Sequence, residues 1–244
     1  MKLRIACLLL SVLLCLSLVC LTACKDEEEN GDENTPPVDT NTDYADPSTV
    51  LYEGNEIFGT TLRWEIYKDG TLYIKGTGGM PADLVTSAET GANNQPWAAY
   101  INGGFVTITK LVVEDSVTAL SEMSFLNCVD LQEVVLGAGI TNIPYECFSN
   151  CRSLKKVVAK NVVTIEDCAF QGCKRLSSVT LSAQLSEVMD GAFHDAGSGV
   201  TNGYTLTLSG TETEWNTAKE TLVVAPNGND WMTTAMQSPK FIAK

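Results

Sequence analysis

The chain of 244 residues contains a single histidine, His194, and lacks most of the motifs that carry chemistry. No two cysteines have the Cys-x-x-Cys spacing, which argues against a zinc site. No glycine-rich phosphate loop or nucleophile elbow is present, and Gly76-x-Gly78-Gly79 lacks the helix and spacing of a dinucleotide fingerprint. We therefore expect a protein that is not an enzyme and that uses no cofactor and no metal.

Basic residues are also scarce, with 16 Lys and Arg against 30 Asp and Glu, for a net charge of −14. Loss of the first 23 residues, which contain Lys2 and Arg4 and no acids, would make it −16. Phosphates bind Lys and Arg, so this balance disfavours nucleic acid as a partner.

The N-terminus has the pattern of a secretory signal. Lys2 and Arg4 precede residues 5–22, which are almost wholly apolar. The alternative is a transmembrane anchor, because this run is nearly long enough to span a bilayer. Leu21-Thr22-Ala23-Cys24 resembles the lipobox of bacterial lipoproteins. That resemblance implies that residues 1–23 are removed and that Cys24 carries the lipid that attaches the protein to a membrane.

Residues 24–48 form a predicted tether. After Cys24 the segment holds nine acidic residues, one lysine and three prolines, with almost nothing apolar, so it should stay disordered and extended. Lys25-Asp26-Glu27-Glu28-Glu29 also resembles the acidic export signal of Bacteroidetes surface lipoproteins. The resemblance implies an outer-membrane location, facing the cell exterior.

The middle of the chain repeats itself every 22–23 residues. The repeat shows in columns of matched residues: Phe125, Phe148, Phe170, Phe193; Leu120, Ile143, Ile165, Val188; Leu111, Val134, Val157, Val179. Such a period predicts an α/β-type solenoid, in which about four coils over residues 104–200 stack parallel strands. The matching strands are expected near 110–114, 131–136, 156–160 and 178–182.

Two further columns predict details of each coil. Asn127, Asn150, Gly172 and Asp195 tolerate a positive φ, so we expect each short helical turn to end there in the left-handed region. Cys128, Cys151 and Cys173 follow them and should form a buried ladder. Cys147 and Cys168 lie in neighbouring coils one column out of register, which leaves a disulfide between them open.

Each end of the solenoid should be covered by a cap. In residues 49–103, two alternating runs flank Asp69-Gly70 and predict a β-hairpin, while Trp97 is expected to insert into the start of the stack. In residues 201–244, Thr205–Leu208 and Thr221–Val224 look like strands 16 residues apart, and Trp215 and Trp231 repeat that interval. Shorter coils are therefore predicted to close the C-terminal end.

The repeat resembles the BspA-like leucine-rich repeats of Bacteroides-type surface proteins. Its clearest copy runs Ile165-Glu-Asp-Cys-Ala-Phe170-Gln-Gly-Cys173-Lys-Arg-Leu176-Ser-Ser-Val179-Thr-Leu181, and the block from Trp64 to Trp97 looks like the segment that often precedes such repeats. The resemblance implies a short leucine-rich-repeat stack and a role in adhesion or in binding host or partner proteins.

The candidate binding strip is the outer face of the stacked strands. It consists of Val112, Val135, Val158 and Thr180 with Lys110, Glu133 and Lys156. Outward valines are unusual on a solvated sheet and suggest a protein or glycan partner, unless the N-terminal block covers them. The alternatives are an accessory component of an outer-membrane surface complex and, third, a carboxylate-dependent hydrolase. His194 falls in a variable column, which is typical of a surface position.

Overall fold

The computed structural model describes most of the chain after residue 48, within one compact unit, Pro36–Lys244. The described residues are 49–54, 57, 60–81, 85–87, 92–93, 95–201 and 205–243. The predicted signal peptide, Cys24 and the acidic tether lie outside them. Within the described ranges, no helix combines the length and the apolar character needed to cross a bilayer.

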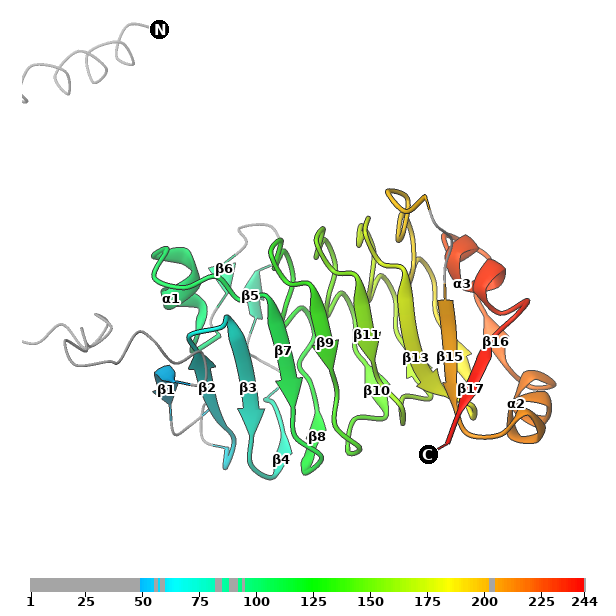
Figure 1. Ribbon diagram of the computed structural model, residues 1–244, viewed down its shortest axis with the longest axis horizontal. Helices are drawn as coiled ribbons and strands as arrows, with labels where there is room; N and C mark the ends of the chain where they lie inside the picture. Colours follow the sequence, from blue (N-terminus) through cyan, green and yellow to red (C-terminus); the bar gives the residue numbers. More distant parts are fainter. Residues whose placement is uncertain are drawn as a thin grey trace, which may run out of the picture. The chain divides into compact units, whose positions relative to one another are not determined.

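A nine-stranded sheet, here called the main sheet, runs through the whole described part (Figure 1). In spatial order its strands are β1 (Val50–Gly54), β2 (Arg63–Tyr67), β3 (Thr71–Lys75), β7 (Lys110–Val113), β9 (Glu133–Val135), β11 (Lys156–Val158), β13 (Ser178–Ser182), β15 (Thr205–Ser209) and β17 (Lys240–Ile242). The first two pairings are antiparallel and every pairing from β3 onward is parallel. The predicted stack of parallel strands is therefore confirmed.

A second sheet lies further along each coil and is also parallel. Its strands are β10 (Asn142–Ile143), β12 (Thr164–Ile165), β14 (Glu187–Val188) and β16 (Val223–Val224). Two short pairs, β4 (Gly78–Gly79) with β8 (Val117–Ala119) and β5 (Val85–Ser87) with β6 (Ala92–Asn93), complete the strands. The helices within the described ranges are α1 (Ala98–Asn102), α2 (Glu212–Lys219) and α3 (Asp230–Ala235).

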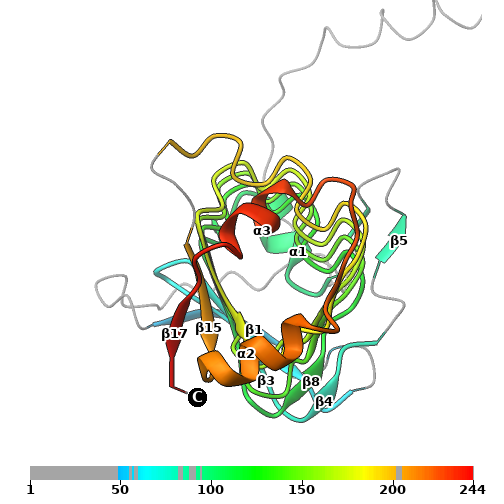
Figure 2. The ribbon, with the colours of Figure 1, turned by 90° about the vertical axis from the view of Figure 1, so that its right-hand side faces the viewer.

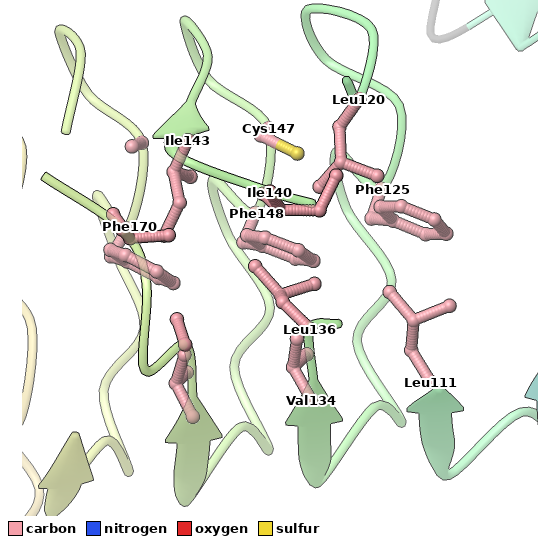
Figure 3. Packing of buried hydrophobic residues seen from close by; sticks show 14 of the residues in the cluster. Leu111, Leu120, Phe125, Val134, Leu136, Ile140, Ile143, Cys147, Phe148 and Phe170 are labelled. Carbon is pink, nitrogen blue, oxygen red and sulfur yellow. The ribbon is translucent and has the colours of Figure 1, made fainter. Parts of the chain in front are cut away.

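A continuous file of aromatic rings passes through the core (Figure 3). Trp97, Phe125, Phe148, Phe170 and Phe193 stack in that order, with centroids 5.7, 5.4, 5.5 and 5.2 Å apart and the first three ring pairs inclined by only 8°. All five side chains are buried. Each stacked pair contributes about 0.5–1.5 kcal/mol beyond the burial of its area, so the predicted phenylalanine column stabilises every junction between coils.

The predicted left-handed column is confirmed. Asn127, Asn150, Gly172 and Asp195 have φ of 60, 58, 68 and 57°. A second left-handed column, which the residue types did not predict, lies four residues earlier: Met123, Glu146, Cys168 and Gly191, with φ between 49 and 62°. Between and at two such left-handed positions, the amides of residues 123, 125 and 127 donate to the carbonyls of residues 145, 147 and 149 in the next coil at 2.9 Å each.

The five cysteines outside residues 1–48 are free thiols, so Cys147 and Cys168 are not joined. Cys151 and Cys173 are fully buried, and each Sγ donates to a carbonyl of the preceding coil, Phe125 at 3.2 Å and Phe148 at 3.1 Å. Burial raises the pKa of the Cys173 thiol to about 12 and keeps it protonated. The predicted cysteine ladder thus also bonds coil to coil, although Cys128, at its first position, is only half-buried.

The N-terminal segment contains the predicted hairpin, β2 and β3, around Gly70 at φ 81°. The hairpin does not lie over the sheet. β3 pairs in parallel with β7, so the segment extends the main sheet at its edge. Trp97 is 1% exposed and stacks on Phe125, as predicted, and α1 follows it directly.

The C-terminal prediction of shorter coils is wrong. Thr205 pairs with Ser178 after 27 residues, and Lys240 pairs with Thr207 after 33, whereas β16 joins the second sheet rather than the main one. The step from β15 to β17 is long because α2 and α3 lie between these strands, and the two helices cover the end of the stack (Figure 2). Trp215, Met232 and Ala235 are buried against the core from these helices.

Candidate functional site

The candidate binding strip forms by simple alternation along the strands. On β7, Leu111 and Val113 point into the core, so Lys110 and Val112 point outward. Because the strands stack in register, Val112, Val135, Val158 and Thr180 become neighbours in one row. Lys110, Glu133 and Lys156 form the adjacent row.

The strip is partly accessible at its three valines. Val112, Val135 and Val158 are half-buried, whereas Thr180 is only 8% exposed. Thr180 lies between Val158 and Thr207 within the longest stretch of parallel pairing, β13 with β15. The accessible apolar part of the strip therefore extends from β7 to β11.

Two ion pairs border the valines. Glu133 accepts from Lys156, with Nζ–Oε1 at 2.9 Å, and its other oxygen lies 3.5 Å from Lys110 Nζ. The hydrogen bond from Lys156 holds the pKa of Glu133 below its usual value, with Lys110 adding to the effect. These side chains remain between 29 and 52% exposed, so the ion pairs fix the positions of the charges but contribute little to the stability of the fold.

An aromatic group, here called the tyrosine cluster, continues the strip toward β2. Val112 pairs with Tyr73, and Tyr73 pairs with Glu65 on the next strand. Tyr67 packs edge-on against Tyr73, with ring centroids 5.0 Å apart. Lys75 Nζ lies 5.1 Å from the centroid of the Tyr73 ring and 5.8 Å from that of Tyr67, within cation–π range.

Glu65 is the polar centre of this cluster. Its Oε2 accepts from Lys75 Nζ at 2.6 Å and from the Tyr67 hydroxyl at 2.8 Å, and Arg63 lies 3.8 Å from Oε1. Partial burial raises the pKa of Glu65, but the hydrogen bonds from Lys75 and Tyr67 outweigh it and the net shift is downward. The cluster therefore presents two tyrosine rings, positioned by Glu65 and Lys75, on the outer face of the main sheet.

The tyrosine cluster was not predicted from the sequence, although the alternation that positions it is present there. Alternation in the hairpin places Leu62, Trp64 and Ile66 inside, which leaves Glu65 and Tyr67 outside. The interval from β3 to β7 is 39 residues rather than 22–23, so a search for columns at the repeat period does not connect Tyr73 with Val112.

His194 lies on the surface, as its column predicted. Its Nδ1 is 3.3 Å from Gln171 Nε2, and it lines a pocket of about 250 Å³ together with Asp195, Ser198 and Asp230. A hydrogen bond from Ser198, and then Lys174, lower the pKa of Asp195, which makes it a poor proton donor. The described residues hold no group of three or more His, Cys, Asp or Glu that could bind a metal ion.

Comparison with known proteins relates this architecture to a repeat family. Residues 102–203 match the family model described as BspA type leucine rich repeat region, in six copies. A search of curated proteins finds no match.

Two solved structures resemble the chain at 18% sequence identity. One is a leucine-rich repeat protein from Eubacterium ventriosum, with a TM-score of 0.51 over 79% of this chain and 44% of that one. The other is a leucine rich cell surface protein from Faecalibacterium prausnitzii, with a TM-score of 0.37 over 64% of this chain and 40% of that one. The chain thus spans less than half the length of either protein, and the first likeness supports the fold alone.

Proposed function

Because residues 102–203 form leucine-rich repeats of the BspA type, we propose that this protein is a non-catalytic binding module that recognises another protein at the cell surface. The binding surface is the outer face of the main sheet, from the tyrosine cluster through the candidate binding strip. The proposal depends on one observation above all, the unbroken row Tyr73, Val112, Val135 and Val158 on an accessible face.

The chemistry of this row favours a polypeptide over a glycan. Three of its members are aliphatic, and the charged residues beside them are already paired with one another. Interfaces between proteins combine apolar contacts at the centre with polar groups at the rim, and tyrosine is enriched among the residues that dominate binding. Sugars stack best on aromatic rings, which in this row are confined to the β2–β3 end.

Catalysis is not part of the proposal. The carboxylates with shifted pKa values, Glu65, Glu133 and Asp195, are all shifted downward, toward the ionised form. Hydrolysis of a glycosidic bond needs a carboxylic acid that stays protonated near neutral pH. The hydrolase alternative therefore gains no support from these groups.

The N-terminal sequence supports a location at the cell surface. We propose that Cys24 carries the lipid, that the acidic tether holds the folded part clear of the outer membrane, and that the protein faces the exterior. Metabolic labelling with an alkyne fatty acid should mark the wild type and leave Cys24→Ala unmarked. Protease added to intact cells should remove the wild-type protein, and its survival would contradict the exterior location.

Crosslinked pull-down from intact cells tests the binding surface. Val135→Asp with Val158→Asp places two carboxylates in the row and should abolish recovery of the specific partner. Thr118→Asp with Thr141→Asp, at exposed positions away from the main sheet, is the matched control and should recover it. Equal recovery by both variants, each with a wild-type melting temperature, would refute the surface.

A further inference from the structure

Five exposed cationic side chains gather at the edge where β11 and β13 begin. We call them the basic cluster: Arg152, Lys155, Lys156, Lys174 and Arg175. Arg152 and Lys174 occupy the same position in consecutive coils, because each follows a cysteine that bonds to the coil before it. The carbonyl of Lys155 accepts the amides of Ser177 and Ser178 at 3.1 Å each, which holds these coils side by side.

The positive charge of the basic cluster is only partly balanced. Lys156 pairs with Glu133 at 2.9 Å and Lys174 with Asp195 at 3.4 Å. Lys155 contacts the neutral Gln132 at 3.3 Å. Arg152 and Arg175 form no ion pair with any residue that the structure describes. In a chain with a net charge of −14, this concentration of positive charge is a local reversal of sign.

The basic cluster adjoins the valines of the strip. Lys156 and Val158 lie on the same face of β11, two residues apart, and Val158 pairs with Val135. A ligand that lies here therefore meets ammonium or guanidinium groups and aliphatic side chains together. An extended peptide presents side chains on one face about every 6.6–7 Å. A carboxylate and an apolar side chain two residues apart in such a peptide therefore have the same spacing as Lys156 and Val158 on β11.

We propose that the surface selects an extended acidic peptide segment of its partner, whose carboxylates contact the basic cluster and whose apolar side chains contact Val135 and Val158. The inference rests on the proposed function and adds the charge and conformation of the bound segment. A sulfated or uronic glycan would satisfy the cations but would not use the valines.

Two synthetic peptides of about twelve residues, enough to span several strands at 4.8 Å spacing, provide the probe. One repeats Glu-Ser-Val-Ser, which places Glu and Val on the same face of an extended chain, and is called the Glu/Val peptide. The other repeats Glu-Ser-Ser-Ser at equal charge and is called the Glu/Ser peptide. Fluorescence anisotropy with the folded protein should give tighter binding of the Glu/Val peptide. Binding of both should weaken as NaCl rises from about 50 to about 300 mM, because salt screens exposed charges.

Arg152→Glu with Arg175→Glu should weaken both peptides by about tenfold or more, since two favourable contacts become repulsive. Lys219→Glu with Thr118→Glu and Thr141→Glu makes the same total change of charge at positions outside the main sheet and should alter binding by less than about twofold. All five positions are exposed, so the fold should be retained. Val135→Asp should remove the preference for Glu/Val over Glu/Ser.

The outcomes separate this inference from the proposed function. Unchanged binding by the double arginine variant, or equal effects of this variant and its charge-matched control, would overturn the acidic-peptide inference while the valine effect could still stand. Tighter, arginine-dependent binding of heparin than of the Glu/Val peptide would assign the cluster to an anionic glycan and also overturn it. No preference between the peptides, together with no effect of Val135→Asp, would count against the proposed function itself.

Discussion

At the residue scale, the turns of this solenoid depend on backbone conformations that most residues avoid. Each repeat holds two left-handed positions, and only three of the eight residues involved are neither Gly, Asn nor Asp: Met123, Glu146 and Cys168. A left-handed residue with a Cβ costs about 1–2 kcal/mol, so these three persist because the surrounding coil-to-coil hydrogen bonds hold them. Those bonds, rather than side-chain preference, fix the second column.

Substitution at Asn127 tests the cost of the left-handed backbone directly. Asn127 is exposed with φ 60°, so its side chain contributes little packing. Asn127→Val should lower the free energy of unfolding by about 1–2 kcal/mol, because a β-branched residue is strained at positive φ, whereas Asn127→Gly should be neutral or slightly stabilising. Urea unfolding of the three proteins measures the difference. Equal stabilities would show that the turn relaxes at no cost.

At the element scale, the turns of a terminal coil have no further coil to accept or donate their hydrogen bonds, so other groups must take its place. Asn229 serves this purpose at the C-terminal end, and it is only 2% exposed. Its Oδ1 accepts the Phe193 amide at 3.1 Å, and its Nδ2 donates to the carbonyls of Met189 and Ala225 at 3.0 and 2.8 Å. One amide side chain thus replaces the backbone that a further repeat would supply.

Asn229→Ala removes all three hydrogen bonds, including the one that pairs the buried Phe193 amide. The expected loss is about 2–4 kcal/mol of unfolding free energy, with faster hydrogen exchange at the Phe193 amide. Asn227→Ala, at an exposed position two residues earlier, is the matched control and should change stability by less than about 0.5 kcal/mol. An Asn229→Ala protein as stable as this control would exclude the capping role.

The elements of the fold differ in how well they could be predicted from the sequence. The strands of the main sheet and the first left-handed column were predictable because each coil makes the same contacts as its neighbours, so one period describes them all. The C-terminal prediction failed because the 16-residue interval joins Trp215 in α2 to Trp231 in α3, and Leu208 in the main sheet to Val224 in the second sheet, so it marks no coil. The tyrosine cluster was missed because the 39-residue step from β3 to β7 hides its connection to Val112.

At the scale of the whole described part, stability is spread along a line. Each coil contacts chiefly the coils on either side, so the stack approximates a row of units coupled by their interfaces. The file from Trp97 to Phe193 provides that coupling through every repeat. A binding surface on such a scaffold stays aligned only while the interfaces between coils remain intact, because Val112, Val135 and Val158 come from three different coils.

Loss of a ring from the middle of this file should therefore let the N-terminal and C-terminal parts of the stack unfold separately. Phe148→Ala removes a fully buried ring that stacks on both Phe125 and Phe170, at a cost of about 3–5 kcal/mol, a large share of the roughly 5–15 kcal/mol that stabilises a typical domain. Variants that keep only Trp97 or only Trp215 report on the N-terminal and C-terminal parts. In the wild-type background both probes should follow one urea transition, and with Phe148→Ala the two transitions should separate.

Phe148→Leu, which keeps an apolar side chain at the junction, should show a smaller separation. Coincident transitions in Phe148→Ala would show that coupling passes through the two sheets instead of the aromatic file.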